Sequence, residues 1–242
     1  MQAMIFAAGL GTRLRPLTDL IPKALVEVQN RPMLDWVVRA LGKAGVTKLV
    51  INTHYKAEQI ERFCFEQLKG LEWYLSYEPE ILGTGGGLKQ ASRWLTEDFF
   101  LVNADIFTNL DYRWFLKQHQ ASKAEITLAV NQAPASSELL VDQKNRLIGL
   151  RRPNADRIVL SPQGAARPQN FCGIHLINQS FLARLGGQVE FSIIEEYLKQ
   201  IPQGLNIHCT DISPFSWLDI GTPADLSRAQ TLELSRAPSL DF

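Results

Sequence analysis

The first 25 residues constrain the fold of this chain more than any other segment. An apolar run over residues 4–8 leads into a loop that contains Gly9 and Gly11. Three cations follow shortly after the loop: Arg13, Arg15 and Lys23. Glycines let backbone N–H groups approach an anion closely, and guanidinium and ammonium groups neutralise phosphate charge. The segment therefore predicts a strand that leads into a phosphate-binding loop.

Two common phosphate-binding loops do not fit this segment. A Walker A loop ends in Gly-Lys followed by Ser or Thr, and the chain has no such sequence. The dinucleotide-binding fingerprint requires a third glycine at the position that Leu14 occupies. The loop therefore belongs to another class of phosphate site.

Apolar segments and helical patterns alternate through the first half of the chain. Strands are predicted at residues 3–8, 48–52, 73–77 and 99–102, and helices at residues 34–41, 57–68 and 88–95. The run at 99–102 is apolar throughout, as expected for a strand that is buried on both faces of a parallel sheet. This alternation predicts an α/β fold with a doubly wound, Rossmann-like sheet.

The second half of the chain has a different pattern. Strands at 126–130, 139–141, 147–150 and 172–177 are predicted to be mixed or antiparallel and to form one side of a cleft. Ser192 and Glu195 predict a capping box for a helix over 193–200, and Thr222 before Pro223 predicts the start of the last helix. No repeat or linker interrupts the pattern, so we expect one mixed-sheet domain over residues 1–234 and a frayed tail over 235–242.

Composition excludes several classes of function. The 25 cations and 25 anions give zero net charge, so we expect no general attraction to nucleic acid or to an anionic membrane. No apolar run approaches about twenty residues, no signal peptide pattern precedes the first strand, and the three cysteines lack metal-site spacing. These features predict a cytoplasmic protein whose cysteines are small buried hydrophobic residues.

Two further segments carry chemistry. Asp105 follows the buried strand at its carboxyl end, where ligands bind in open α/β sheets, although its position alone also fits a helix cap or a turn. Gly85, Gly86 and Gly87 come together just before a predicted helix. Three glycines in a row fit either a close backbone approach to a ligand or a hinge above the cleft.

Three motifs together resemble those of the sugar-1-phosphate nucleotidyltransferases. They are G-x-G-T-R-L-x-P-L-T at residues 9–18, P-K at 22–23 and W-x-D-I-G-T-P at 217–223. The resemblance implies the glycosyltransferase A-like variant of the Rossmann-like fold, and transfer of a nucleotidyl group from a nucleoside triphosphate to a sugar 1-phosphate. It also implies that Asp105 and Asp219 share one Mg²⁺, an ion that carboxylate oxygens suit. A helix cap is the alternative interpretation of Asp219.

The resemblance implies roles for individual residues. The predicted catalytic residues are Arg13, Lys23 and Asp105. The predicted nucleotide-binding residues are Ala8, Gly9, Gly11, Thr12, Arg13, Lys23, Gly83, Thr84 and Gly85. The predicted residues at the sugar are Asn103, Cys172 and Gly173, and the predicted metal ligands are Asp105 and Asp219. No acid–base role is assigned to His54 or His175.

Within the superfamily, the short length and the loops look closest to bacterial N-acetylmuramate 1-phosphate uridylyltransferases, which act in peptidoglycan recycling. We therefore expect UTP and N-acetylmuramate 1-phosphate as substrates. Many relatives have an E-E-K-P segment where this chain has Leu-Arg-Arg-Pro at 150–153, which leaves the sugar open. The alternatives are a guanylyltransferase for mannose or heptose 1-phosphate, a cytidylyltransferase for a phosphorylated alcohol, and a nucleotide-sensing subunit without activity. The sequence leaves open the oligomeric state and any substrate contacts of Glu80, Arg151, Arg152 and Glu195.

Overall fold

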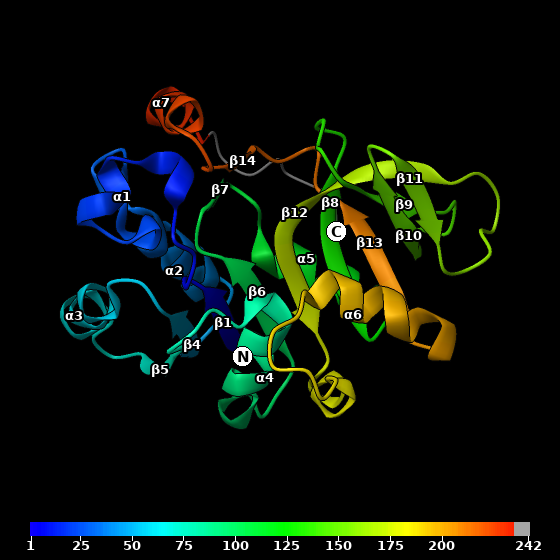
Figure 1. The fold of residues 1–242 in the computed structure, drawn as a ribbon, viewed down its shortest axis with the longest axis horizontal. Helices are drawn as coiled ribbons and strands as arrows, with labels where there is room; N and C mark the ends of the chain where they lie inside the picture. Colours follow the sequence, from blue (N-terminus) through cyan, green and yellow to red (C-terminus); the bar gives the residue numbers. More distant parts are fainter. Residues whose placement is uncertain (235–242) are drawn as a thin grey trace.

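The computed structural model describes residues 1–234, and ten of their strands form one sheet (Figure 1). At its centre, β1 (Gln2–Phe6) lies parallel between β4 (Lys48–Thr53) and β6 (Phe99–Asn103). β5 (Glu72–Tyr77) extends the parallel part beyond β4. These four strands match the strands predicted in the first half of the chain.

The other half of the sheet is mainly antiparallel. β12 (Arg167–Ile177) pairs antiparallel with β6 and joins the two halves. The remaining strands of this half are β8 (Ile126–Asn131), β9 (Glu138–Val141), β10 (Leu147–Arg152), β11 (Ala155–Ile158) and β13 (Ile207–Asp211). The order across the sheet is β11-β10-β9-β12-β6-β1-β4-β5, with β8 paired to β12 and β13. The predicted doubly wound mixed sheet is confirmed.

Helices cover both faces of this sheet (Figure 1). α2 (Met33–Lys43), α3 (Ala57–Gln67) and α5 (Tyr112–Ser122) cover one face, and α4 (Gly83–Ala91) and α6 (Ile193–Gln200) cover the other. The short helix α1 (Leu17–Leu20) and the last helix α7 (Pro223–Thr231) lie outside these two layers. Short 3-10 turns occur at Thr12–Leu14, Lys23–Leu25, Ser92–Trp94, Gln179–Arg184 and Ile201–Gln203. The pattern at 88–95 predicts the start of α4 too late, because the glycines themselves form its first turns.

The alternation of side chains along β1 explains the two layers of helices. Ala3 and Ile5 are buried in one apolar cluster with residues of α2, α3 and α5. Met4 points to the opposite face, into a second cluster with residues of α4 and α6. Successive side chains of a strand point to opposite faces, so an apolar run becomes a strand that is buried on both sides.

A third apolar cluster connects the two ends of the described chain. Leu14 from the glycine loop packs in it with Phe107, Leu218 and Ile220. These residues come from β7 (Ile106–Thr108), its antiparallel partner β14 (Trp217–Asp219) and the turn that follows. A small hairpin, β2 (Glu27–Val28) with β3 (Arg31–Pro32), also contributes through Val28. The cluster fixes the phosphate loop beside the segment that carries the second predicted metal ligand.

The two predicted helix starts have different outcomes. Thr222 Oγ1 accepts a hydrogen bond from the Asp225 N–H at 3.2 Å, so the predicted cap of α7 is confirmed. The prediction of a capping box for α6 is wrong, because the Ser192 side chain makes no capping hydrogen bond. Thr84 Oγ1 accepts a hydrogen bond from the Ile193 N–H instead. A residue from α4, far away in sequence, has replaced the local cap.

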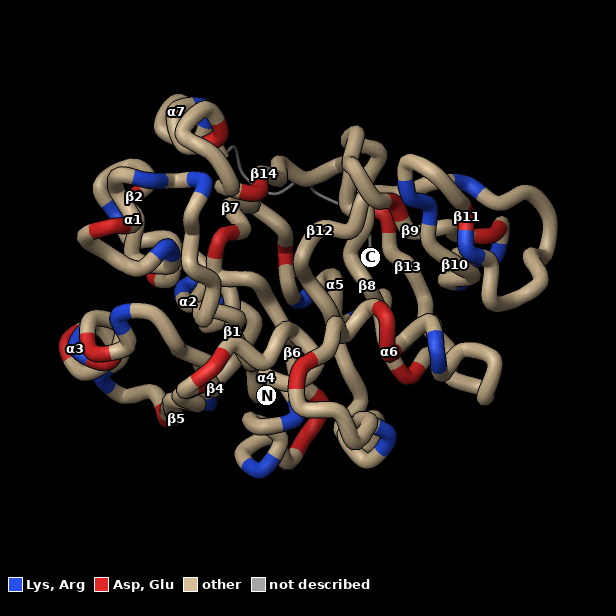
Figure 2. The backbone as a smooth tube through the Cα atoms, viewed as in Figure 1, with Lys and Arg blue, Asp and Glu red and all other residues tan. Residues whose placement is uncertain are grey.

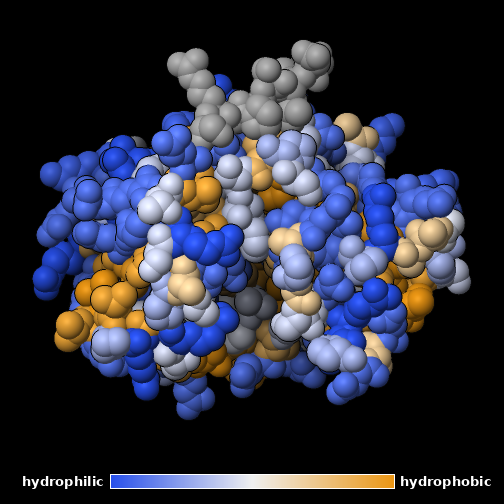
Figure 3. Space-filling view, turned by 90° about the horizontal axis from the view of Figure 1, so that it is seen from above, coloured by the Kyte–Doolittle hydropathy of each residue, from blue (hydrophilic) through white to orange (hydrophobic). Residues whose placement is uncertain are grey.

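Cations and anions are interspersed along the whole backbone (Figure 2). The face seen from above is mainly hydrophilic, and hydrophobic residues show on it in several separate places, with the largest group at the lower left (Figure 3). The predicted tail over 235–242 lies outside the described residues. Among residues 1–234, no helix has both the length and the apolar character needed to cross a membrane. Cys64, Cys172 and Cys209 are free and buried, as predicted.

Candidate active site

The loop after β1 is folded back on itself at Gly11. This residue has a φ of 65°, in the left-handed region, and a Cβ there would lie 2.9 Å from side-chain atoms of Lys23 and Thr18. Its carbonyl accepts hydrogen bonds from Thr18 Oγ1 and from the Leu14 N–H, each at 2.9 Å. Glycine adopts this backbone conformation without strain, which explains why the loop needs it here.

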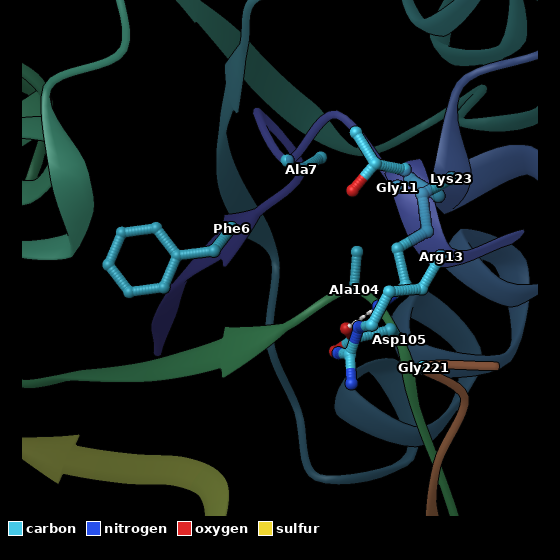
Figure 4. Close-up of a pocket in the computed structure, with 11 residues that line it drawn as sticks. Phe6, Ala7, Gly11, Arg13, Lys23, Ala104, Asp105 and Gly221 are labelled. Carbon is cyan, nitrogen blue, oxygen red and sulfur yellow. Dashed lines mark hydrogen bonds and ion pairs between the residues drawn. The ribbon is translucent and has the colours of Figure 1, made fainter. Parts of the chain in front are cut away.

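A pocket of about 180 Å³ opens between this loop and the carboxyl end of β6 (Figure 4). Six of the predicted site residues line it: Gly9, Gly11, Thr12, Arg13, Lys23 and Asp105. Ala8, 8% exposed, lies between two lining residues, Ala7 and Gly9. Sites for whole small molecules usually measure about 300–1,000 Å³, so this cavity has the size for phosphate groups rather than for a complete nucleotide.

The charged side chains of the pocket point toward one another (Figure 4). Lys23 Nζ forms an ion pair with Asp105 Oδ2, and both side chains are mostly buried. Arg13 lies against Gly221, where a Cβ would come within 2.8 Å of the guanidinium. The glycine after Asp219 and Ile220 therefore leaves the space that the Arg13 side chain occupies.

Asp219 reaches the pocket region through the antiparallel pairing of the distant strands β7 and β14. It is paired with Ile106, the residue after Asp105, and the Ile220 N–H donates to the Asp105 carbonyl at 3.0 Å. Leu218 and Ile220, on either side of Asp219, are buried in the third apolar cluster with Leu14. Because successive side chains along a strand alternate in direction, the side chains of Leu218 and Ile220 are buried and the Asp219 carboxylate points to the opposite side, next to Asp105.

The two carboxylates fit a divalent cation. Burial and the charge of Asp105 raise the pKa of Asp219 to about 6, and Lys23 and Arg13 offset part of this rise. Asp105 Oδ1 and Asp219 Oδ1 are both buried without a hydrogen-bond partner among the described residues. Buried acceptors without partners are costly, and a hard cation would satisfy both. Within residues 1–234 no cluster of three or more His, Cys, Asp or Glu could hold a metal, so water and phosphate oxygens would complete the coordination.

The glycine segment of α4 does not line this pocket. A Cβ on Gly85 would lie 2.2 Å from the Phe191 ring, and a Cβ on Gly86 would lie 2.2 Å from the Val189 carbonyl oxygen. The Gly85 N–H donates to the Phe191 carbonyl at 2.8 Å. The close backbone approach expected from the glycines is therefore made by the chain's own residues 189–191. The nucleotide-binding roles of Gly83, Thr84 and Gly85 stay predictions.

The residues predicted at the sugar lie where β6 meets β12. Gly173 has a φ of 71°, and a Cβ there would lie 2.9 Å from Asn103 Nδ2. Cys172 is fully buried in the core, and its carbonyl accepts a hydrogen bond from Trp217 Nε1 at 2.9 Å. Because the Cys172 thiol faces the core, this residue could contact a ligand only through its backbone.

Four polar residues whose substrate contacts the sequence leaves open also lie outside the pocket lining. Arg151 pairs with Asp156 at 2.9 Å, and Arg152 pairs with Glu195 on α6. Glu80 is exposed to solvent. The structure therefore gives Arg151, Arg152 and Glu195 partners within the protein.

Sequence reasoning missed two buried polar residues, Asn52 and Glu78. The Ala7 N–H donates to Asn52 Oδ1 at 2.8 Å, and Asn52 Nδ2 donates to Glu78 Oε1 at 2.7 Å. Both residues stand at the carboxyl ends of predicted parallel strands, where ligand sites form. That position was the signal available in the sequence, and it favours Glu78 over the exposed Glu80.

Comparisons with known proteins agree with this fold. The family model described as Nucleotidyl transferase matches residues 2–139, and the chain belongs to this family. Among solved structures, a putative glucose-1-phosphate thymidylyltransferase from Bacillus anthracis has a TM-score of 0.79 at 19% identity, covering 100% of this chain and 97% of that one. HddC from Yersinia pseudotuberculosis, complexed with GMP-PN, has a TM-score of 0.72 at 20% identity, covering 95% and 97%. At these identities the likeness shows the fold alone.

Two curated relatives are guanylyltransferases by name. The mannose-1-phosphate guanyltransferase of Gibberella zeae is 33% identical over 242 residues, which cover 97% of this chain and 65% of that protein. The mannose-1-phosphate guanylyltransferase catalytic subunit beta of Danio rerio is 34% identical over 230 residues, covering 93% and 62%. The chain thus spans less than two thirds of the length of these relatives. Their names favour the guanylyl alternative over the uridylyl expectation and give no support to a role in peptidoglycan recycling.

Proposed function

We propose that this chain transfers a guanylyl group from GTP to a sugar 1-phosphate of the mannose type, with release of pyrophosphate. The observation that carries the proposal is the convergence of Arg13, Lys23, Asp105 and Asp219 at one small pocket. The guanine base and the mannose-type acceptor rest on the names of the relatives and on the GMP-PN complex of HddC. UTP with N-acetylmuramate 1-phosphate, the first expectation from the sequence, has no such support.

The proposed reaction depends on neutralising the negative charge of the phosphates more than on proton transfer. An oxygen of the sugar 1-phosphate attacks the α-phosphorus of the triphosphate, a new P–O bond forms, and the bond to the β-phosphate oxygen breaks. The attacking oxygen is already anionic, so no side chain has to remove a proton. The barrier comes from repulsion between two polyanions and from their alignment.

The residues at the pocket match these demands. Arg13 and the amides of the Gly9–Thr12 loop would hold the β- and γ-phosphates, because guanidinium groups and inward-pointing N–H groups bind anions well. Lys23 would stabilise the charge that develops on the α-phosphate. Asp105 and Asp219 would hold Mg²⁺, which supplies Lewis-acid neutralisation of the reacting phosphates. Asp105, which pairs with Lys23 in this structure, would bind Lys23 less strongly when it holds a cation, and the Lys23 ammonium would then be available to phosphate.

A pyrophosphate-release assay tests the proposal. GTP, UTP, CTP and dTTP would be combined with mannose, heptose and glucose 1-phosphates and with N-acetylmuramate 1-phosphate. We expect the highest kcat/KM for GTP with a mannose-type acceptor, and a tenfold preference corresponds to about 1.4 kcal/mol of differential transition-state binding. A higher value for UTP with N-acetylmuramate 1-phosphate would restore the uridylyl alternative. Tight GTP binding without turnover would support the nucleotide-sensing alternative.

A further inference from the structure

The two cations of the pocket are held in place by different means. Lys23 Nζ forms an ion pair with Asp105 Oδ2, which fixes the ammonium. The Arg13 side chain is exposed, and its guanidinium makes no hydrogen bond or ion pair with any other of residues 1–234. Within the described chain, the position of this guanidinium therefore depends on packing.

The Arg13 guanidinium packs against Gly221, and both residues line the pocket (Figure 4). A Cβ on Gly221 would lie 2.8 Å from Nη2, 3.2 Å from Cζ and 3.3 Å from Nη1 of Arg13. These three atoms are the heavy atoms nearest to such a Cβ. The space that a side chain at position 221 would need is thus filled by the guanidinium group itself.

The backbone does not itself require a glycine at position 221. Gly221 is not one of the positive-φ glycines of residues 1–234, so an alanine could adopt its conformation without strain. The residues on either side are fixed, because the buried Ile220 donates its N–H to the Asp105 carbonyl at 3.0 Å and Thr222 caps α7. A methyl group at 221 would therefore displace the Arg13 side chain rather than the backbone. The physical reason for a glycine here is the Arg13 guanidinium.

We infer that Gly221 is a positioning residue, whose missing side chain sets the place and the plane of the Arg13 guanidinium for binding the pyrophosphate part of the nucleoside triphosphate. This inference rests on the proposed function, in which Arg13 holds the β- and γ-phosphates. A guanidinium binds phosphate through a planar fork of parallel N–H groups, so a shift of its plane costs more affinity than the same shift of a point charge. Position 221 thus controls affinity for pyrophosphate and leaves affinity for the acceptor sugar unchanged.

A double-mutant cycle tests whether Gly221 acts through Arg13. The four proteins are the wild type, Gly221→Ala, Arg13→Ala and the double variant. The probe is inorganic pyrophosphate in magnesium buffer, with its Kd measured by calorimetry, because it carries the phosphate groups and no base. Gly42→Ala is the matched control, since a Cβ on Gly42 in α2 would meet no heavy atom within 4 Å.

We expect Gly221→Ala to weaken pyrophosphate binding about tenfold, as the loss of a hydrogen bond to a charged group does. In the Arg13→Ala background the same substitution should weaken it no further, because residues in contact are not additive. Gly42→Ala should keep the wild-type Kd. In steady-state kinetics, Gly221→Ala should raise KM for the triphosphate and leave KM for the sugar 1-phosphate unchanged. An unchanged Kd in Gly221→Ala, or a further tenfold loss in the Arg13→Ala background, would overturn the inference.

Thermal unfolding and turnover complete the test. If Gly221→Ala does not fold, a folded double variant shows that the guanidinium is what excludes a side chain at 221, and an unfolded double variant overturns the inference. If the wild type binds pyrophosphate but turns over no triphosphate, the proposed function fails and the binding cycle still decides the role of Gly221. Turnover as proposed, with wild-type pyrophosphate affinity in Gly221→Ala, refutes the inference alone. A wild type that does not bind pyrophosphate also refutes it.

Discussion

Lowering the pH from 7 to 5 should destabilise this protein partly through one buried histidine. His175 is 1% exposed in the core, where Nδ1 lies 3.0 Å from the Tyr197 hydroxyl and the ring contacts Phe171. Burial lowers the pKa of His175 from 6.5 to about 3. The folded protein therefore keeps the ring neutral between pH 6.5 and 3, while the unfolded chain takes up a proton. The contribution of the neutral His175 ring to the free energy of unfolding is fully present above pH 6.5 and is lost progressively as the pH falls toward 3.

The size of the effect follows from linkage. A shift of 3.5 pKa units corresponds to roughly 5 kcal/mol over the whole range, of which about 2 kcal/mol falls between pH 7 and pH 5. Urea unfolding of the wild type and of His175→Gln at pH 7, 6 and 5 measures this difference, because all other titrating groups are common to both proteins. We expect the wild type to lose about 2 kcal/mol more than the variant between pH 7 and 5. Parallel losses in the two proteins would refute the reasoning.

Three further predictions concern the site and its support. Lys23→Ala should lower kcat by roughly 10²- to 10³-fold with a much smaller change in triphosphate affinity; a rise in KM alone, in steady-state kinetics, would make it a binding residue instead. Asp219→Ala should move the magnesium dependence of the rate to higher concentration, and removing Asp105 as well should cost little more, because residues that act as a unit are not additive. Full activity of Asp219→Ala at ordinary magnesium would contradict the shared-ion assignment. Gly85→Ala should destabilise the protein by about 1–3 kcal/mol in urea unfolding through its clash with the Phe191 ring, and a Phe191→Ala background should remove that cost. Additive losses would show that the clash is not the cause.

The sequence predicts the parts of this fold that depend on local pattern. The apolar runs of β1, β4 and β6 and the alternating helical patterns give the parallel half of the sheet, because side-chain period and burial are set by neighbouring residues. Thr222 before Pro223 likewise gives the start of α7. Even Gly11 follows from the loop motif, since its positive φ is a local requirement.

Contacts between distant segments were beyond sequence reasoning. The helix of residues 112–122 was not expected, and α4 begins at Gly83 because residues 189–191 pack on its glycines. The cap of α6 comes from Thr84, more than a hundred residues away. Local propensity carries no information on which distant segment will supply the missing partner.

At the candidate site too, local motifs can be predicted from the sequence, whereas contacts between distant segments cannot. Arg13, Lys23 and the glycine loop could be identified from the sequence because they lie within one short motif whose residue types match phosphate chemistry. Asp219 could be named only by resemblance, and its meeting with Asp105 is decided by the β7–β14 pairing and by the apolar cluster around Leu14 and Ile220. The hydrogen bond from Asn52 Nδ2 to Glu78 Oε1 depends on the register of β1, β4 and β5, which brings buried side chains from separate strand ends within hydrogen-bond distance. The chemical groups of the site can be read from the chain, but which of them come into contact depends on the folded structure, because distances across a sheet are set by packing and not by separation along the chain.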